Sequence, residues 1–541
     1  MRIIFLIVFF ILFSFAPTFY EWVVADHIRP ERYFELVHNF PTDYNLYLSR
    51  IREGKEGAWF ATEKYTSEPH AGSLSQILYV LIGRLADMNY VQTPYVWFAY
   101  HVARAFFAGF LLFIIWKVVE WVITPSGSRG AYQFQILTFL LIVTASTWPK
   151  FEWVAGYPRF GGYMPWYTMA DSLQRTTFMP HVTLAQALLA FIVLVFSGGF
   201  VTKKMPGNWI FLGVVGIVLG IVFPPALLFL YGVLLLVTIF ERFKKDLFGR
   251  IIFGIMTIPT VVYYYLLLGQ YPWKRLVEFD VLHPTKFSYM EYFLAVGPVL
   301  PLGLIGIGIW AIWGRGEIRE KMKYFVAWIV AWLGFVLLFN WIPQQSPTRF
   351  TQMVPHIPLG IMAAWGIWEI GKKIPVARVI AVVVILFGLG TMVSSFMWQK
   401  DFVDHKLRAT LPIVPSGARV MYPMREIIDG LTWLQIYTPR SAVVLSAMTT
   451  GNSIPVYAGN TAYVGHANTV RLEEKLAATE SFYRGQMSLS WLNEQNIAYV
   501  FYGFEEQDIN GGVSDLRDFY PDLEQVYEST SVRIYKVVLV P

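Results

Sequence analysis

Residues 209–240 read WIFLGVVGIVLGIVFPPALLFLYGVLLLVTIF, an apolar run whose interpretation decides the fold of the whole chain. A membrane-spanning helix needs about 20 mostly apolar residues, so this run is too long for one span. Pro224 and Pro225 interrupt it, and proline inside a helix removes a hydrogen bond and clashes with the preceding turn. We therefore predict two short helices joined by a tight outer turn, Trp209–Val222 and Pro225–Phe240.

The overall composition is typical of a membrane protein. Of the 541 residues, 55% are hydrophobic and 15% are charged, and the mean hydropathy is +0.47. Soluble domains usually contain about 25% charged residues. The net charge of +6 reports orientation in such a chain, and no Lys/Arg run predicts nucleic-acid binding. The absence of cysteine excludes disulfides, thiolate catalysis and cysteine-ligated zinc.

Nine further segments have the length and apolarity of spans, which predicts eleven in total. The first admits two interpretations: a signal peptide cleaved near Val23-Val24-Ala25, or an uncleaved helix, which its length favours. The nine segments are Ile3–Val24, Pro94–Val119, Tyr132–Trp148, His181–Val201, Ile251–Leu268, Tyr292–Trp313, Tyr324–Trp341, Pro355–Ile370 and Val376–Trp398.

The distribution of Lys and Arg supports eleven spans. With the N-terminus inside, the inner loops and span ends carry fifteen basic residues and the short outer loops carry seven. This is the bias that the positive-inside rule requires. If residues 209–240 formed one helix, the later basic loops would fall outside. The predicted outer face therefore contains residues 26–90, residues 149–180 and everything after about Gln399.

The chain is predicted to divide into two domains. Residues 1–398 form a transmembrane domain that includes the first outer loop, where Ser73–Leu85 is predicted to be an interfacial helix. Residues 399–541 form a soluble extracytoplasmic α/β domain, because short apolar strands alternate with helices. The strands are Ala442–Ala447, Ala462–Gly465 and Ile497–Tyr502, the helices are Val470–Arg484 and Leu489–Gln495, and Gln525–Val540 closes as a hairpin.

The first outer loop offers the clearest chemistry. Its stretch Phe40–His70, FPTDYNLYLSRIREGKEGAWFATEKYTSEPH, contains Asp43 and the turn Glu68-Pro69-His70. Two carboxylates and an imidazole can perform general-base work or bind a metal. The alternative is that outer loops are polar anyway. Glu53 and Glu56 are predicted on the solvated face of a short helix.

Arg349, in Ser346-Pro347-Thr348-Arg349-Phe350, lies in a short outer loop beside the bilayer. A guanidinium there can hold a lipid phosphate bidentately. An interfacial arginine that snorkels to head groups is an equal alternative. His356 follows at the start of the next helix, either sharing the Arg349 site or simply lying at the interface.

Other polar residues lie within or beside the spans. His101 and Arg104 are three residues apart within one span, and intramembrane ionisable residues default to functional or paired roles. For Arg104, structural pairing inside the bundle is favoured. Asp171, Arg175 and His181 gather at the outer end of the fourth span, where they either line the same cavity or are ordinary loop residues.

A glycine-punctuated patch marks the tail. It comprises Thr450–Pro455, Tyr457–Gly459 and Gly465-His466. One interpretation is a loop that recognises an acceptor. Turn chemistry alone also explains these residues and is favoured.

With these residues in place, the chain resembles the GT-C superfamily of polyprenyl-phosphate-sugar-dependent glycosyltransferases, closest to the protein mannosyltransferase and lipid A aminoarabinose transferase branch. The similar elements are Asp43-Tyr44, Gly57-Ala58-Trp59, Glu68–Leu74, and Arg349-Phe350 through Pro355 and Pro358. Two departures stand out. Tyr44 replaces a second acidic residue found in many members, and one proline replaces the usual pair.

The resemblance implies an inverting transfer of a sugar from a polyprenyl-phosphate donor to a lipid, glycan or protein acceptor. It implies an enzyme of the cytoplasmic membrane, and the bias of basic residues predicts that its N-terminus lies inside and its active site outside. Asp43 would act as the base, Glu68 would orient His70 or hold a cation, and His70 and Arg349 would bind the donor phosphate. A divalent metal, if any, would be held by Asp43 and Glu68. The residues predicted to line the cavity are Tyr44, His101, Arg104, Asp171, His181 and His356.

Two other functions compete with this one. A transporter or flippase of lipid-linked glycans often shows internal repeats and broken helices at the midplane. Here the only interrupted pair is at Pro224-Pro225, and it has no counterpart elsewhere in the sequence. A non-catalytic membrane assembly protein is the third possibility.

Overall fold

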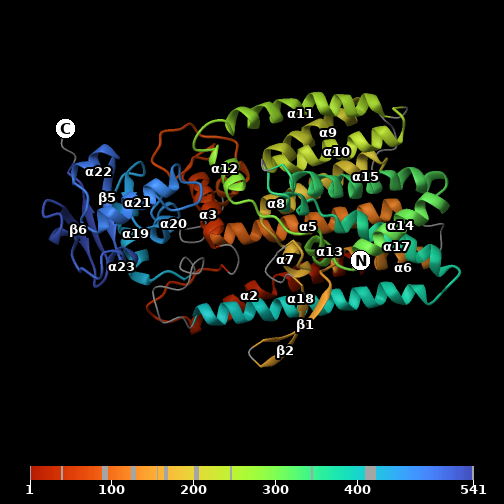
Figure 1. Ribbon diagram of the computed structural model, residues 1–541, viewed down its shortest axis with the longest axis horizontal. Helices are drawn as coiled ribbons and strands as arrows, with labels where there is room; N and C mark the ends of the chain where they lie inside the picture. Colours follow the sequence, from red (N-terminus) through yellow and green to blue (C-terminus); the bar gives the residue numbers. More distant parts are fainter. Residues whose placement is uncertain are drawn as a thin grey trace. The chain divides into compact units, whose positions relative to one another are not determined.

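The computed structural model of the chain is mostly helical, with a small sheet near the C-terminus (Figure 1). It describes residues 2–37, 41–87, 96–123, 129–154, 156–163, 169–199, 206–243, 246–342, 345–407 and 422–538. By compactness these form two units. Unit 1 comprises residues 1–16, 102–265 and 280–398, and unit 2 comprises residues 17–101, 266–279 and 399–541. The boundary after Trp398 is shared with the predicted division, but the first outer loop groups with the C-terminal segment.

Apolar helices make up most of unit 1. All eleven predicted spans coincide with a helix or a bent pair of helices in the described residues. The helices are α1 (Arg2–Ser14), α2 (Ala16–Val23), α5 (Val96–Val122), α6 (Arg129–Val143), α7 (Ser172–Thr176), α8 (Pro180–Phe196), α9 (Pro206–Val222), α10 (Pro224–Phe240), α11 (Leu247–Leu267), α12 (Arg275–Leu282), α13 (Tyr289–Val296), α14 (Val299–Trp313), α15 (Gly316–Phe339), α16 (Thr348–Thr351), α17 (His356–Gly371) and α18 (Ala377–Leu407). Most of α2 and of α12 belongs to unit 2.

These helices identify an integral membrane protein. Among the described residues, four are long and apolar enough to cross a membrane, namely α5, α11, α15 and α18. The number rises to six if the bent pairs α1–α2 and α13–α14 each form one span. Several other apolar helices, including α6, α8, α9 and α10, contain 17 residues or fewer. The count of eleven crossings therefore stays a prediction.

The predicted break of residues 209–240 into two helices is confirmed, whereas its position on the outer face stays a prediction. Helix α9 ends at Val222 and α10 begins at Pro224, with Phe223 between them in a non-helical conformation. Pro224 occupies the first turn of α10, where its missing N–H has no helical partner to lose. Helix α10 packs against α9 and also against α15, and it lies between them in Figure 1.

The predicted span Tyr292–Trp313 is not one straight helix. Helices α13 and α14 meet at an angle of 88°. Gly297, between them, has φ +73°, a conformation that side chains rarely adopt. A Cβ atom at Gly297 would lie 1.9 Å from the carbonyl oxygen of Ser146. The Trp148 backbone N–H also donates to the Leu294 carbonyl at 2.9 Å. The break is therefore set by close backbone packing that hydropathy does not register.

A β-hairpin was not predicted in residues 149–180. Strands β1 (Pro149–Val154) and β2 (Tyr157–Gly162) pair antiparallel, from Pro149 opposite Gly162 to Val154 opposite Tyr157. Phe160 of β2 stacks on Phe387 of α18, with ring centroids 6.3 Å apart. The hairpin is thus anchored to a long apolar helix.

Unit 2 contains the predicted first outer loop, much of which is helical. After η1 (Ala25–His27) it forms α3 (Pro41–Lys55) and α4 (Ile77–Asp87), the latter matching the predicted interfacial helix. The two helices touch at their backbones. A Cβ atom at Gly54 would lie 1.9 Å from the Val80 carbonyl oxygen, and one at Gly83 would lie 1.9 Å from the Ile51 carbonyl oxygen. Two glycines on facing helices therefore fix the crossing point.

The C-terminal segment forms the predicted α/β layer, drawn in blue in Figure 1. Its five-stranded sheet has the order β4-β3-β5-β7-β6; β3 pairs parallel with β4 and β5, and β7 pairs antiparallel with β5 and β6. The elements are α19 (Arg425–Tyr437), β3 (Val443–Leu445), α20 (Met448–Tyr457), β4 (Thr461–Ala462), α21 (Leu472–Tyr483), α22 (Ser490–Glu494), β5 (Ile497–Tyr502), α23 (Phe504–Ile509), η2 (Leu516–Asp518), β6 (Glu524–Glu528) and β7 (Arg533–Lys536).

Replacing Gly297 tests the break between α13 and α14. We expect Gly297→Ala to destabilise the protein by about 2 kcal/mol or more, because alanine is strained at positive φ and its methyl group meets the Ser146 carbonyl. Gly308→Ala in α14 is the matched control, since a Cβ atom there meets nothing within 4 Å. Thermal unfolding in detergent measures both variants. Equal stability of the two would show that the break does not depend on Gly297.

Candidate functional site

Asp43 lies in the first turn of α3, next to the helix start at Pro41. A helix N-terminus interacts favourably with negative charge, which suits a carboxylate at this position. The Asp43 side chain is 41% exposed, so it is accessible from solvent. Its Oδ1 lies 3.3 Å from Nε2 of His466, a buried histidine of the C-terminal segment.

The hydrogen bonds of His466 define which ring nitrogen carries the proton. Nδ1 accepts the backbone N–H of Asn468 at 3.1 Å. In the neutral ring the other nitrogen must then be the donor, so Nε2–H points at the Asp43 carboxylate. The turn itself is fixed by Thr469, whose N–H donates to the His466 carbonyl at 2.9 Å and whose hydroxyl donates to the Tyr65 carbonyl at 2.7 Å.

The glycine-punctuated patch holds α20 against α3. The interpretation of Thr450–Pro455 as a loop or turn is wrong, because these residues lie in helix α20 and are buried. Asn452 connects the elements: its Oδ1 accepts from Asn45 Nδ2 at 2.9 Å, and its Nδ2 donates to the Gly465 carbonyl at 3.0 Å. A Cβ atom at Gly451 would lie 1.9 Å from the Val464 carbonyl oxygen. The patch thus carries the backbone next to His466 close to α3.

Buried ion pairs account for two other carboxylates of the first loop. Arg50 is fully buried and donates to Glu63 Oε2 at 2.9 Å and to Glu53 Oε2 at 3.4 Å. The prediction that Glu53 lies on a solvated face is wrong, since its side chain is 8% exposed. Glu56 is partly exposed and pairs with Arg52 at 2.8 Å. Helix α3 is covered on more than one face, which its weak amphipathic pattern did not reveal.

Glu68 is tied to the C-terminal segment. Its carboxylate accepts Lys475 Nζ at 2.8 Å and the Thr66 hydroxyl, and Arg471 lies 3.5 Å away. Burial opposes ionisation, but the hydrogen bonds from Lys475 and Thr66 outweigh it, so the pKa of Glu68 lies below its ordinary value. This carboxylate has a structural role that the sequence did not indicate.

His70 is hydrogen-bonded within its own loop. Nε2 accepts the Glu63 backbone N–H at 2.7 Å, so Nδ1 is the donor to the Glu68 backbone carbonyl at 2.7 Å. The ring also lies edge-on to Trp273 at 6.1 Å. Glu68 therefore orients His70 through its main chain, and its carboxylate points to Lys475. Both ring nitrogens of His70 are therefore engaged in hydrogen bonds to backbone groups of its own loop.

The residues around Glu68 do not fit a divalent cation. Lys475 and Arg471 beside the carboxylate would repel one. Across the part of the chain that the structure describes, no three His, Asp or Glu side chains gather as metal ligands. A metal held by Asp43 and Glu68 stays a prediction.

Tyr44 and His101 lie close together in unit 2. Tyr44 is 3% exposed and packs edge-on against Tyr100 with ring centroids 5.0 Å apart. His101 Nε2 lies 2.7 Å from the Leu36 carbonyl, to which it donates, and 3.5 Å from the Tyr44 hydroxyl. Both side chains are buried, which favours a supporting role for the first turn of α3.

In unit 1, several predicted residues are engaged in packing. Arg104 is buried and donates from Nε to the Thr177 carbonyl at 2.9 Å, the structural pairing that the sequence favoured. Asp171 caps α7 by accepting the Leu173 N–H at 2.8 Å. His181 lies against Phe223 with ring centroids 5.9 Å apart.

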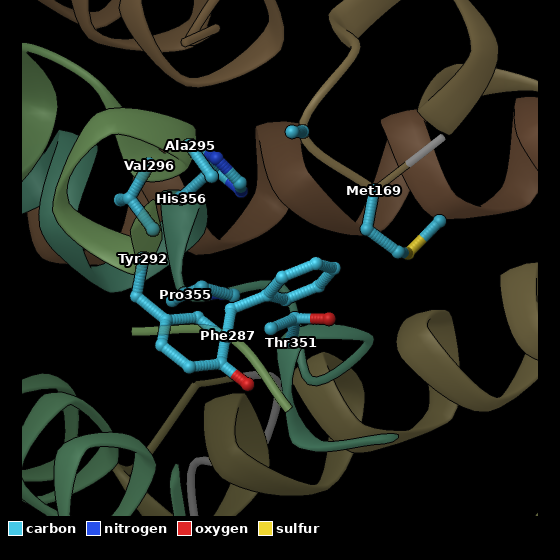
Figure 2. A pocket seen from close by; sticks show the side chains of 9 residues that line it. Met169, Phe287, Tyr292, Ala295, Val296, Thr351, Pro355 and His356 are labelled. Carbon is cyan, nitrogen blue, oxygen red and sulfur yellow. The ribbon is translucent and has the colours of Figure 1, made fainter. Parts of the chain in front are cut away.

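His356 lines a small, mostly apolar pocket of unit 1, shown in Figure 2. Its Nε2 lies 3.4 Å from Arg175, and its buried Nδ1 has no hydrogen-bond partner among the described residues. Figure 2 shows the His356 ring, the Phe287 ring and the Met169 side chain around this space. The full lining is Met169, Ala170, Phe287, Tyr292, Ala295, Val296, Thr351, Pro355 and His356.

Arg349 forms a bidentate ion pair with Asp280 of α12. Nε and one terminal nitrogen of the guanidinium lie 3.1 Å from the two carboxylate oxygens. Asp280 is 5% exposed and also accepts Gln345 Nε2 at 2.6 Å, whereas the Arg349 side chain is 37% exposed. The carboxylate thus holds an arginine that solvent can still reach.

The structure therefore joins some predicted residues and adds one that sequence reasoning missed. Asp43 meets His466, Glu68 meets His70 through a main-chain carbonyl, and Tyr44 meets His101. Arg349 and His356 belong to unit 1. The only sequence signal for His466 was its place after Gly465, in a patch assigned to turns.

Comparison with known proteins gave structural matches of low similarity. No known protein family matches the sequence, and no curated protein is similar to it. ArnT from Cupriavidus metallidurans bound to undecaprenyl phosphate aligns over 97% of both chains at 13% identity, with a TM-score of 0.49. The Archaeoglobus fulgidus oligosaccharyltransferase tethered with an acceptor peptide aligns over 99% of this chain and 74% of that one at 13% identity, with a TM-score of 0.42. Both TM-scores lie below 0.5.

Replacing Glu68 tests its structural role. We expect Glu68→Gln to lower the free energy of unfolding by about 1–2 kcal/mol at pH 7, because the Lys475 pair is lost. A lowered pKa stabilises the fold above the ordinary glutamate pKa of 4.5, and that contribution disappears as the pH falls through the pKa of the folded state. The difference between variant and wild type should therefore shrink below pH 4.5.

Thermal unfolding in detergent at several pH values measures this difference. Glu480→Gln is the control, since its pair with Arg484 is about half exposed and should contribute little. A Glu68→Gln deficit that stays constant down to pH 4 would contradict the assignment.

Proposed function

We propose that this protein is a membrane glycosyltransferase of the GT-C type that transfers a sugar from a polyprenyl-phosphate donor to an acceptor hydroxyl or amine. The observation that carries the proposal is the state of Asp43. It is a solvent-accessible carboxylate at a helix N-terminus that receives a hydrogen bond from a neutral imidazole. This is a suitable arrangement for a general base.

Comparison with the carboxylates that follow it in the loop singles out Asp43. Glu53 and Glu63 are buried against Arg50, Glu56 pairs with Arg52, and Glu68 pairs with Lys475. A cation beside a carboxylate stabilises its charge and weakens it as a base. Asp43 contacts His466, and its side chain is more exposed than those of the other four, at 41%.

The proposed reaction is a single displacement. The acceptor O–H or N–H gives its proton to the Asp43 carboxylate as the acceptor atom attacks the anomeric carbon. The bond from that carbon to the phosphate oxygen breaks, and its electron pair leaves with the polyprenyl phosphate. One displacement at the anomeric carbon inverts its configuration. Arg349 is proposed to neutralise the departing phosphate, since a guanidinium binds phosphate oxygens bidentately.

The ion pair with Asp280 supports this role for Arg349. Holding the guanidinium in one orientation lowers the entropy lost when a phosphate binds. The Arg349 side chain is 37% exposed, so it is partly accessible to such a group. The bias of Lys and Arg supports placing Asp43 and Arg349 on the same outer face of the cytoplasmic membrane. Tyr44 and His101 are proposed to support the first turn of α3.

Neutralising Asp43 tests the proposed base. We expect Asp43→Asn to lower the transfer rate at least 100-fold, because general-base catalysis typically contributes 10²–10⁴-fold. Asparagine keeps an oxygen that can accept from His466, so the local fold should persist. The measurement is transfer from a panel of radiolabelled polyprenyl-phosphate sugars in liposomes containing the purified protein. Glu56→Gln, one residue after the end of the same helix, is the control and should stay within twofold of wild type.

Replacing Arg349 and its partner Asp280 one at a time tests the proposed phosphate binding. We expect Arg349→Gln to weaken binding of undecaprenyl phosphate at least tenfold, whereas Asp280→Asn should weaken it less than threefold because the guanidinium remains. Binding to the purified protein in detergent is measured for both, alongside thermal stability. If both variants bind equally and lose equal stability, Arg349 serves only the ion pair.

A further inference from the structure

The C-terminal segment contributes a residue that acts on the proposed base. We propose that His466 is a positioning residue for Asp43: its Nε2–H donates to the carboxylate and holds it in the orientation that accepts the acceptor's proton. This inference rests on the proposed function, because it assigns a partner to the base named there. It makes the C-terminal segment part of the active site.

The first argument is the direction of the hydrogen bond. The Asn468 N–H donates to Nδ1 at 3.1 Å, so Nδ1 is an acceptor and Nε2 is the donor. A donor is what a carboxylate needs as a partner. The distance of 3.3 Å to Asp43 Oδ1 is at the long end for hydrogen bonds, which is common for catalytic contacts before substrate binds.

The second argument is that the position of His466 is fixed on several sides. The side chain is 6% exposed, and its ring lies 5.4 Å from that of Tyr65. Asn468, which fixes the tautomer, donates from Nδ2 to Glu63 Oε2 at 3.1 Å. Glu63 is itself held by the fully buried Arg50. A chain of contacts therefore runs from the buried ion pairs of the first loop to the imidazole.

The third argument is chemical. A lysine or arginine in the place of His466 would orient Asp43 equally well, but its full charge would weaken the carboxylate as a base. A neutral imidazole orients the carboxylate without adding a full positive charge beside it. Positioning of this kind raises the fraction of encounters in a reactive geometry. It should therefore act on kcat and leave the affinity for the lipid donor nearly unchanged.

Two amide substitutions distinguish the role of the His466 hydrogen-bond donor from that of the side-chain volume. In His466→Gln, the amide nitrogen can reach the place of Nε2 and donate to Asp43. In His466→Asn, the shorter side chain ends near the place of Nδ1 and cannot reach it. Both replace a buried imidazole with a polar amide, so they should cost similar stability. Exposed His405→Gln in α18 is the control for the substitution itself.

We expect His466→Asn to lower kcat at least tenfold, with KM for the lipid donor within twofold of wild type, and His466→Gln to retain at least one third of wild-type kcat. The assay is transfer in liposomes, and thermal unfolding in detergent confirms that both variants are folded. Equal kcat for the two variants, whether high or low, would overturn the positioning role, because reach to Asp43 would then not matter.

A double variant distinguishes this inference from the proposed function. If Asp43→Asn alone leaves transfer unchanged, the proposed base is wrong. If Asp43→Asn abolishes transfer and His466→Asn has no effect, only the role of His466 is wrong. When both are right, Asp43→Asn/His466→Asn should lie within twofold of Asp43→Asn, because a positioning residue has nothing left to position. A further tenfold loss in the double variant would overturn the inference.

Discussion

Backbone-to-backbone contact with α3 is the constraint on which the candidate site depends. At Gly54 and Gly83 the helices α3 and α4 approach so closely that a Cβ atom would overlap a carbonyl oxygen. Helix α20 packs on α3 as well, joined by the amide pair Asn45–Asn452. Contacts of this kind leave no room for a rigid shift of α3 along or around its axis. Helix packing thus fixes the backbone position of Asp43. A carboxylate on an irregular loop would have to be fixed by its own hydrogen bonds.

Most charged side chains of unit 2 described above stabilise the fold, whereas Asp43 is proposed to take part in the reaction. Arg50, Lys475 and their carboxylate partners are largely buried, and removing one member of such a pair leaves an uncompensated charge. These pairs connect segments far apart in the chain, since Lys475 belongs to the C-terminal segment and Glu68 to the first loop. Glu35 illustrates a different solution: burial raises its pKa to about 8, so it stays protonated near neutral pH and needs no cation. Asp43, by comparison, is partly exposed and contacts His466.

Much of the architecture could be read from the sequence because it follows hydropathy and turn chemistry. The break at Pro224, helix α4 and the strands and helices of the C-terminal segment all coincide with predicted elements. The angle at Gly297 could not be predicted, because a glycine among apolar residues looks like part of a span until its neighbour Ser146 is known. Within the site, Asp43 was found from its context. His466 was not, because tertiary contacts over 423 positions leave no local pattern.

The interleaving of segments in unit 2 has a consequence for biosynthesis. Residues 17–101 are made first, yet they share one compact unit with residues 399–541, which leave the ribosome last. During insertion, Arg50 and Glu63 can meet early. The contacts of Glu68 with Lys475 and of Asp43 with His466 can form only after the C-terminal segment has been made. The nascent protein is thus without its assembled acid–imidazole pair until nearly the whole chain is complete. Truncated products would carry the aspartate without its partner, so premature termination should yield inert fragments and not deregulated transferases.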